Sequence, residues 1–307
     1  MTDKNKKLTR KEFIQRTSRA IIGAGLIGRA QSDNLPVKSN LEKCSLGKTG
    51  ISMTKLGFGA PRTQEASLIK YAIDNGITFI DTGRGYANGK NEELVGSVIK
   101  GMRKDLVVQS KFRLSFPDGG TNHNSRKIND GLRETFWKSL HESLTALMTD
   151  YIDILLFHGA EDENLLFHET VLELFRKAKE QGKVRASGFS AHVNQADLIK
   201  KAIEVPSYDA AMIAFNHSGG YEHSRSSRRG SWDQEELIKV LKIATGKGIG
   251  IIAMKTCSGG HFSPDDNTSP SFPHALKWVL DQEYIHAAAV AMANFTEVNE
   301  HLAVLKA

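Results

Sequence analysis

The sequence has little cysteine and no long apolar run. Its only two cysteines in 307 residues, Cys44 and Cys257, are too few for a disulfide framework or a closed metal site. We interpret both as small hydrophobic residues of the interior rather than reactive thiols. No apolar stretch is long enough to cross a bilayer as a helix, so no stable transmembrane segment is expected in the mature chain. A content of 40% hydrophobic and 25% charged residues is typical of a globular protein with a full-sized core.

An excess of positive charge is also lacking over most of the chain. The formal charge of +6 is contained in the first thirty residues, where Asp3 and Glu12 are the only acidic side chains. The basic residues of that segment are Lys4, Lys6, Lys7, Arg10, Lys11, Arg16, Arg19 and Arg29. Because the remainder is close to neutral, we expect no nucleic-acid partner.

The basic segment resembles a twin-arginine export signal. The motif TRKEFIQ, with Lys11 where the second arginine would stand, precedes a short apolar run and the small residues that end at Ala30. This predicts an export-signal-like segment at 1–30, an exported or periplasmic protein, and the Tat machinery as a partner. The alternatives are a disordered or membrane-surface extension of a cytoplasmic protein, and a dinucleotide fingerprint. The G-x-G-x-x-G match at 23–28 is a weak indication of a fingerprint, since polar residues precede it and Pro36 leaves no room for a helix.

The rest of the chain repeats one unit. After a polar linker at 31–42, the segment 43–60 has the alternation and the central Thr-Gly of a β-hairpin followed by a strand. Eight apolar runs then alternate with segments of helical periodicity, which are clearest at 128–148 and at 171–178, where Gly182 follows as a C-cap. The runs end at Ala60, Asp81, Phe112, Gly159, Ser190, Asn216, Lys255 and Met292. This pattern predicts a (β/α)8 TIM barrel at 43–307, with the hairpin closing its bottom, rather than an open doubly wound sheet.

Polar residues gather where the predicted strands end, which is where such barrels carry their chemistry. They are Asp81, Tyr86, Lys111, His158, Ser190, His192 and Asn216. Lys111 is the least ordinary of them, because an unpaired ammonium facing a packed barrel is costly. Asp81 on the adjacent strand is its expected partner. A purely structural Asp-Lys pair remains an alternative, and His158 alone could be a core histidine with its hydrogen bonds satisfied.

The spacing D-x4-Y, S-K and L-x-x-H on three successive strands resembles the aldo-keto reductases. In that family of (β/α)8 barrels, Asp, Tyr, Lys and His form a catalytic tetrad, which corresponds here to Asp81, Tyr86, Lys111 and His158. The resemblance covers about residue 43 to the C-terminus and includes LGKTGISMTKLGFGA and GKVRASGFS. The stretches GFSAH and GIIAMK are most similar to a bacterial branch that often carries export signals.

The resemblance implies a reversible hydride transfer between a nicotinamide cofactor and a small carbonyl or alcohol, such as a sugar. Tyr86 would be the general acid and base, with a pKa lowered by Lys111, and Asp81 would hold Lys111 charged. His158, as a neutral donor, would orient the carbonyl. The alternative is a non-catalytic barrel that acts as a ligand-binding sensor or an auxiliary subunit, which altered cofactor positions would favour.

The cofactor positions depart from the family pattern. Ser190 matches the family's serine after the fifth strand, but Ala191 and Met212 replace its Asn and Gln, and Ala291 and Met292 replace the Lys and Ser near the last strand. Candidate cofactor contacts are Ser190, Asn216, Lys255, Asn294, Glu297 and His301. Because Glu297 stands where an Arg commonly holds the 2′-phosphate, we expect an NAD(P)H cofactor with NAD(H) favoured over NADP(H). The loop at 217–234 carries Arg225, Arg228 and Arg229, which suit a pyrophosphate or simply a solvated loop.

Overall fold

The computed structural model of the chain describes residues 41–116, 126–160, 162–222 and 229–306. The predicted export segment 1–30, residues 31–40 of the predicted linker, and Arg225 and Arg228 lie outside those residues. Among the helices that are described, none is long and apolar enough for a membrane span.

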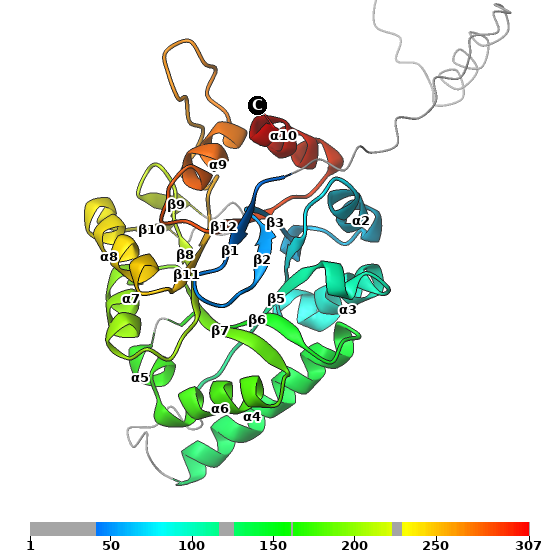
Figure 1. Cartoon of the computed structure of the whole chain (residues 1–307), viewed down its shortest axis with the longest axis vertical. Helices are drawn as coiled ribbons and strands as arrows, with labels where there is room; N and C mark the ends of the chain where they lie inside the picture. The colour runs from blue at the N-terminus through cyan, green and yellow to red at the C-terminus, as the bar shows by residue number, and fades with distance from the viewer. Residues whose placement is uncertain (1–40, 117–125, 161, 223–228, 307) are drawn as a thin grey trace, which may run out of the picture. The chain divides into compact units, whose positions relative to one another are not determined.

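Eight parallel strands form a closed barrel, with the order β11-β12-β3-β4-β5-β6-β7-β8 around the ring (Figure 1). They are β3 (Leu56–Gly59), β4 (Phe79–Asp81), β5 (Val107–Phe112), β6 (Ile152–His158), β7 (Val184–Ala191), β8 (Ala210–Ala214), β11 (Gly250–Met254) and β12 (Ala287–Ala291). Each coincides with one of the eight apolar runs in the sequence. The predicted (β/α)8 TIM barrel is therefore confirmed.

Helices follow the strands around the outside of the ring (Figure 1). They are α2 (Ala66–Asp74), α3 (Lys90–Ile99), α4 (Arg126–Ala146), α5 (Glu163–Leu166), α6 (Glu169–Glu180), α7 (Gln195–Glu204), α8 (Gln234–Gly246), α9 (Phe272–Leu280) and α10 (Phe295–Lys306). Short 3-10 turns occur at η1 (Ala60–Arg62), η2 (Tyr86–Gly89) and η3 (Arg103–Asp105). The predicted helix 128–148 is wrong at its C-terminal end, because α4 ends at Ala146. Met148 has a φ of +53° and is 58% exposed, because the chain leaves α4 after Ala146.

The predicted hairpin is present and closes one end of the barrel. Strands β1 (Lys43–Ser45) and β2 (Ser52–Thr54) pair antiparallel and lie across the ring in Figure 1. Leu46, Ile51 and Met53 of this hairpin form one buried cluster with inward-facing strand residues such as Phe79. Gly57 makes room for that ring, since a Cβ at Gly57 would stand 2.2 Å from the Phe79 side chain. Because the hairpin covers this end, we expect the reactive residues at the opposite end of the barrel.

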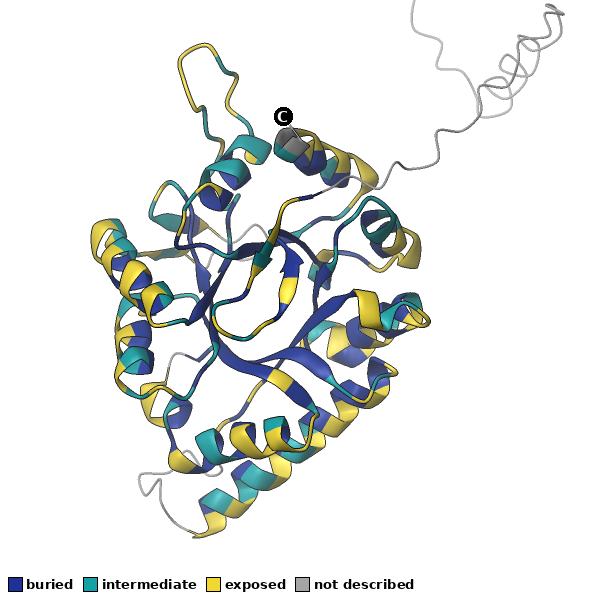
Figure 2. Ribbon diagram, viewed as in Figure 1, coloured by how far each residue is buried: buried dark blue, intermediate teal, exposed yellow. Residues whose placement is uncertain are grey.

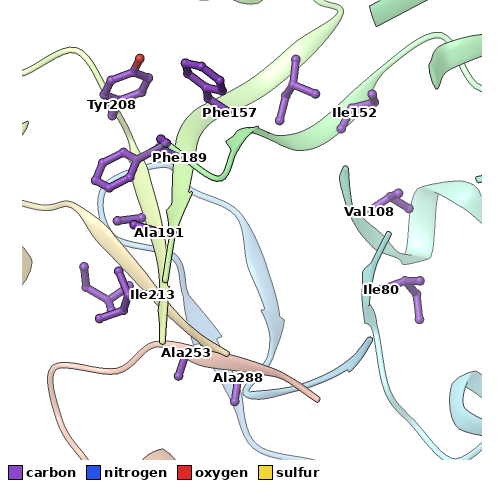
Figure 3. Packing of buried hydrophobic residues seen from close by; sticks show 14 of the residues in the cluster. Ile80, Val108, Ile152, Phe157, Phe189, Ala191, Tyr208, Ile213, Ala253 and Ala288 are labelled. Carbon is purple, nitrogen blue, oxygen red and sulfur yellow. The ribbon is translucent and has the colours of Figure 1, made fainter. Parts of the chain in front are cut away.

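The second face of every strand packs against the helices. Ile80, Val108, Phe189 and Ile213 are buried in this outer core, and Figure 3 shows their side chains on the outside of the strands. Figure 2 shows the same division, with a buried ring of strands and helices that expose only their outer faces. Because side chains alternate along a strand, the residues between these outward-facing ones point into the barrel.

Candidate active site

Strand alternation places three of the candidate residues on the inner face of the barrel. Asp81 ends β4, directly beside Gln109 of β5 in the register, and Lys111 follows two residues after Gln109 on the same face. His158 ends β6 and pairs in register with Ser190 of β7. The carboxyl ends of these neighbouring parallel strands thus bring an acid, an ammonium and an imidazole to one end of the barrel.

Lys111 and Asp81 form a buried ion pair. The Lys111 ammonium donates to Asp81 Oδ1 at 2.5 Å and to the backbone carbonyl of Thr82 at 2.8 Å. The Lys111 side chain is 1% exposed and that of Asp81 is 3% exposed. Gln109 Nε2 also donates to Asp81 Oδ1, at 2.5 Å, and lies 3.3 Å from the Met212 sulfur. The expected pairing of Lys111 with Asp81 is present in the structure.

Tyr86 lies over this pair and against His158. The Lys111 ammonium is 4.9 Å from the centroid of the Tyr86 ring. The Tyr86 and His158 rings meet edge to face, with centroids 5.7 Å apart and an interplanar angle of 84°. Gly83 lies beside both residues, since a Cβ there would be in van der Waals contact with Tyr86 and Lys111 at 3.4 Å. The four residues of the expected tetrad therefore lie together at the carboxyl ends of β4, β5 and β6.

The electrostatics of the site keep its groups in defined protonation states. Burial and then the Lys111 and Arg113 charges lower the pKa of His158 to about 3, so the imidazole is neutral at physiological pH. Burial lowers the pKa of Lys111, but Asp81 and Tyr86 more than offset it, and the ammonium is retained.

The pKa of Tyr86 differs from the sequence-based expectation. Burial raises this pKa, Lys111 lowers it, Asp81 raises it, and the sum lies above the ordinary value. The expected lowering by Lys111 is thus present but smaller than the effect of burial. In the site as it stands, the phenol carries its proton at neutral pH.

A second buried charge supports the turn that carries Tyr86. The Glu92 carboxylate on α3 is fully buried, pairs with Arg84 at 2.9 Å and accepts a hydrogen bond from Ser110 Oγ at 2.5 Å. Arg84 in turn lies over Gly89, where a Cβ would stand 1.1 Å from its guanidinium. Gly89 has a φ of +89°, which only glycine adopts easily.

The turn itself is strained between these contacts. Ala87 and Asn88, directly after Tyr86, both have left-handed backbone angles, with φ of +48° and +52°. Such angles are unfavourable for residues with a side chain and persist only where the surroundings impose them. The ion pair between Glu92 and Arg84 is one of the contacts that surround the turn.

Comparison with known proteins agrees with this geometry. The model of the Aldo/keto reductase family matches residues 50–306. The chain belongs to the aldo/keto reductase family. It is 27% identical over 181 residues to the uncharacterized oxidoreductase YqkF of Bacillus subtilis (strain 168), covering 57% of this chain and 56% of that protein. It is 28% identical over 240 residues to probable aldo-keto reductase 1 of Glycine max, covering 73% of this chain and 62% of that protein. The matched parts thus span less than two thirds of these two relatives.

Solved aldo/keto reductases have the same fold. An aldo-keto reductase from Bacillus halodurans in its holo form superimposes with a TM-score of 0.68 at 20% identity, covering 87% of this chain and 91% of that one. An aldo/keto reductase from Klebsiella pneumoniae in complex with NADP and acetate gives a TM-score of 0.63 at 21% identity, covering 86% and 90%. At these identities the likeness establishes the barrel architecture.

In this aldo/keto reductase, two of the expected cofactor residues organise the barrel rim. The Asn216 amide donates to the Gly220 and Lys255 carbonyls and accepts from the Ser218 amide and hydroxyl. Lys255 has a φ of +60°, and its ammonium lies 5.4 Å from the centroid of the Tyr221 ring. Asn216 therefore shapes the loop after β8 with all of its side-chain polar groups.

Beside these residues lies a cavity of about 680 Å³. It is bounded by the hairpin of β9 (Gly220–Glu222) and β10 (Arg229–Ser231) and by the turn at 258–260. The turn is open at Gly260, which has a φ of +96° and nothing within 4 Å of where a Cβ would stand. Serine residues, Arg229 and Glu222 line the same cavity, and the Arg229 guanidinium pairs with the Glu222 carboxylate at 3.1 Å. Backbone amides, hydroxyls and a guanidinium are groups that bind phosphates.

The remaining cofactor candidates also have internal partners. Ser190 Oγ accepts a hydrogen bond from the Gly159 amide at 3.2 Å. Asn294 caps α10 by accepting from the Glu297 amide at 2.9 Å. The Glu297 carboxylate accepts from the Ala293 amide at 2.9 Å, and His301 Nδ1 donates to the Glu297 carbonyl at 2.6 Å.

Arg62 is a partner of Glu297 that the sequence did not indicate. Its guanidinium spans from η1 to the start of α10 and pairs with both carboxylate oxygens of Glu297, at 3.2 and 3.3 Å. It also donates to the Ala291 carbonyl at 3.2 Å. The two residues are 235 positions apart. Only barrel closure brings them together.

Other residues of the site were missed for simpler reasons. Gln109 shares the inner face of β5 with Lys111, so its spacing of two could have indicated it. Glu92 and Arg84 look like surface charges in sequence, and nothing local distinguishes them. Both cysteines are half-buried, rather than in the interior as interpreted from the sequence. Burial is the main cause that raises the pKa of both thiols to about 11, which agrees with the interpretation that they are not reactive. Within the described residues, no cluster of His, Cys, Asp and Glu could hold a metal ion.

Proposed function

We propose that this aldo/keto reductase is a nicotinamide-dependent oxidoreductase that transfers a hydride between the cofactor and a small carbonyl or alcohol, such as a sugar. The observation that carries the proposal is the buried Lys111–Asp81 pair beneath the ring of Tyr86, with a neutral His158 at the edge of that ring. A pair used only for stability would not need a phenol over it and an imidazole packed against that phenol.

In the direction of reduction, the Tyr86 phenol gives its proton to the carbonyl oxygen. Lys111 stabilises the phenolate that this leaves, because its ammonium is held charged by Asp81 within the barrel. His158 is neutral, so it can orient the carbonyl through a hydrogen bond without adding charge to the site. In the reverse direction the Tyr86 phenolate takes up the hydroxyl proton.

The cofactor supplies and accepts the hydride when it is bound. The cavity of about 680 Å³ beside β8 and β11 has Ser218 and Ser258 at its wall. Arg229 is there too, paired with Glu222 at 3.1 Å, so it would have to exchange this partner to hold a pyrophosphate. Ser190 lies beside His158 in the register, where it would face the carboxamide end of the cofactor. The residues present therefore fit a dinucleotide.

The test measures turnover of a panel of aldehydes, ketones and sugars with NADH and with NADPH, and nicotinamide absorbance monitors the reaction. We expect Tyr86→Phe to lose about 10²–10⁴-fold in kcat, since that is the usual contribution of a general acid, while nucleotide still binds. Tyr71→Phe is the matched control, because the Tyr71 hydroxyl bonds Asn299 away from the site. Nucleotide binding without turnover of any panel member would favour the sensor or auxiliary alternative.

We also propose that NAD(H) is preferred over NADP(H). Arg62, which could otherwise grip a 2′-phosphate, is held by both oxygens of Glu297 and by the Ala291 carbonyl. Fluorescence titration should give tighter binding of NADH than of NADPH. Glu297→Gln should release Arg62 and strengthen NADPH binding, whereas Glu300→Gln, exposed on the same helix, should not. Tight NADPH and weak NADH binding by the wild-type protein would contradict the preference.

We further propose that residues 1–30 direct export, on the strength of the Arg10-Lys11 pair, the apolar run and the small residues before position 31. Since no free nicotinamide pool is expected outside the cytoplasm, the cofactor would be loaded before export and held tightly. Cell fractionation of the full chain and of an Arg10→Ala/Lys11→Ala variant tests the export. Mass spectrometry of copurified nucleotide tests the loading, and loss of the nucleotide on simple dialysis would contradict it.

A further inference from the structure

A second cavity reaches His158 from the side away from β8 and β11. It has a volume of about 410 Å³ and lies between the segment that follows β5 and the segment that follows β6. Phe116 and Phe157 supply apolar walls, and Arg113 and His158 supply polar ones. His158 is the member of the expected tetrad that lines this cavity, so a molecule bound there would lie against that residue.

Arg113 is placed in this cavity by the same strand that carries Lys111. It comes two residues later, directly after the end of β5 at Phe112, and is exposed. Its guanidinium lies over Gly159, 3.5 Å from where a Cβ at that glycine would stand. Gly159 has a φ of +66° and follows His158 directly. The guanidinium thus lies close to the backbone that follows His158.

No ion pair or hydrogen bond joins the Arg113 side chain to another residue of the described ranges. Asp162 also borders the cavity, but its Oδ1 accepts from the amides of Asn164 and Leu165, at 3.0 and 3.4 Å. The charge of Arg113 reaches the reacting groups, where it adds to the lowering of the pKa of His158 and opposes the rise in the pKa of Tyr86. The cavity thus contains a cation whose charge no described carboxylate neutralises.

We propose that Arg113 determines substrate specificity by binding an anionic group, a carboxylate or a phosphate, carried by the carbonyl substrate. This rests on the proposed oxidoreductase function and narrows its substrate class to short acidic carbonyl compounds. A guanidinium presents two parallel N–H donors that match both oxyanions. The aromatic walls suit a short carbon chain between the anion at Arg113 and the carbonyl at His158 and Tyr86.

The test compares matched substrates that differ only in the anion. Succinic semialdehyde is compared with butanal, and glyceraldehyde 3-phosphate with glyceraldehyde, and the larger preference identifies the anion. A hydrogen-bonded charge pair predicts a preference in kcat/KM of about 10–100-fold for the anionic member. Arg113→Gln should reduce this ratio at least tenfold, mainly through KM of the anionic member, and Arg113→Lys should retain part of it. Arg176→Gln, on the exposed face of α6, should leave the ratio unchanged.

Three outcomes separate this inference from the proposed function. Turnover of both members of each pair with a ratio near one overturns the role of Arg113 and leaves the oxidoreductase function standing. If no carbonyl is turned over, the oxidoreductase function fails. Calorimetric titration with succinate then tests whether Arg113 binds an anion. Succinate binding that Arg113→Gln abolishes supports an anion site, and no binding to the wild-type protein overturns it.

Discussion

Replacing Asp81 with Asn should make the stability of this protein depend on pH through Lys111. The Lys111 ammonium is 1% exposed, and Asp81 is its carboxylate partner at 2.5 Å. Asn keeps the shape and one acceptor oxygen but removes the charge. The ammonium is then left in the barrel with the Thr82 carbonyl and the Asn oxygen as neutral acceptors. Removing one partner of a buried pair costs about 3–5 kcal/mol.

The loss has a ceiling, because Lys111 can release its proton. With an unfolded-state pKa of about 10.4 and about 1.36 kcal/mol per pH unit, deprotonation costs about 4.6 kcal/mol at pH 7 and about 1.9 kcal/mol at pH 9. In the wild-type protein, burial lowers the pKa of Lys111, but Asp81 and Tyr86 raise it further, to above the ordinary value. The stability that the charged Lys111 contributes is therefore fully present below its unfolded-state pKa and is lost as pH rises through its folded-state pKa. In Asp81→Asn the folded-state pKa falls, so the destabilisation is largest at low pH and shrinks toward pH 10.

Urea unfolding at pH 7 and pH 9, followed by tryptophan fluorescence, measures this difference. We expect Asp81→Asn to lose less stability at pH 9 than at pH 7, relative to wild type at each pH. Asp81→Asn/Lys111→Met should be more stable than Asp81→Asn alone at pH 7, because the buried charge is gone. Asp74→Asn, which breaks the surface pair with Lys70, should cost less than about 1 kcal/mol. A loss that is independent of pH, or a double variant no more stable than the single, would refute the reasoning.

Two further predictions concern the groups around Tyr86. Glu92→Gln removes the charge that pairs with Arg84 and should lower kcat by about 10-fold, because the turn that carries Tyr86 is then misplaced. Nucleotide binding should change little. Steady-state kinetics and a nucleotide titration measure both effects, and an unchanged kcat would contradict the prediction. Since burial and neighbouring cations lower the pKa of His158 to about 3, its protonation should not change between pH 5 and 8. A break in the kcat profile near pH 6 that disappears in His158→Gln would contradict that assignment.

The barrel and its reactive end could be read from the sequence because both depend on local periodicity. Side chains alternate along a strand, so an acid, a lysine and a histidine at the ends of three successive apolar runs share the inner face wherever those strands pair in parallel. That argument was sufficient for Asp81, Lys111 and His158. It was not sufficient at helix ends, where Met148 continued the period but the backbone had already turned away.

The tertiary structure alone decided what the remaining polar residues do. Glu297 suggested repulsion of a phosphate in sequence, yet barrel closure gives it Arg62 as a partner from 235 residues away. Burial, a property of the whole packed site, outweighs the effect of Lys111 on the pKa of Tyr86. The sequence by itself thus determined which residues meet at the end of the barrel, since the alternation of side chains along a strand follows from the local sequence. Their charge states and partners depend on desolvation and long-range contacts, which exist only once the chain has closed into the barrel.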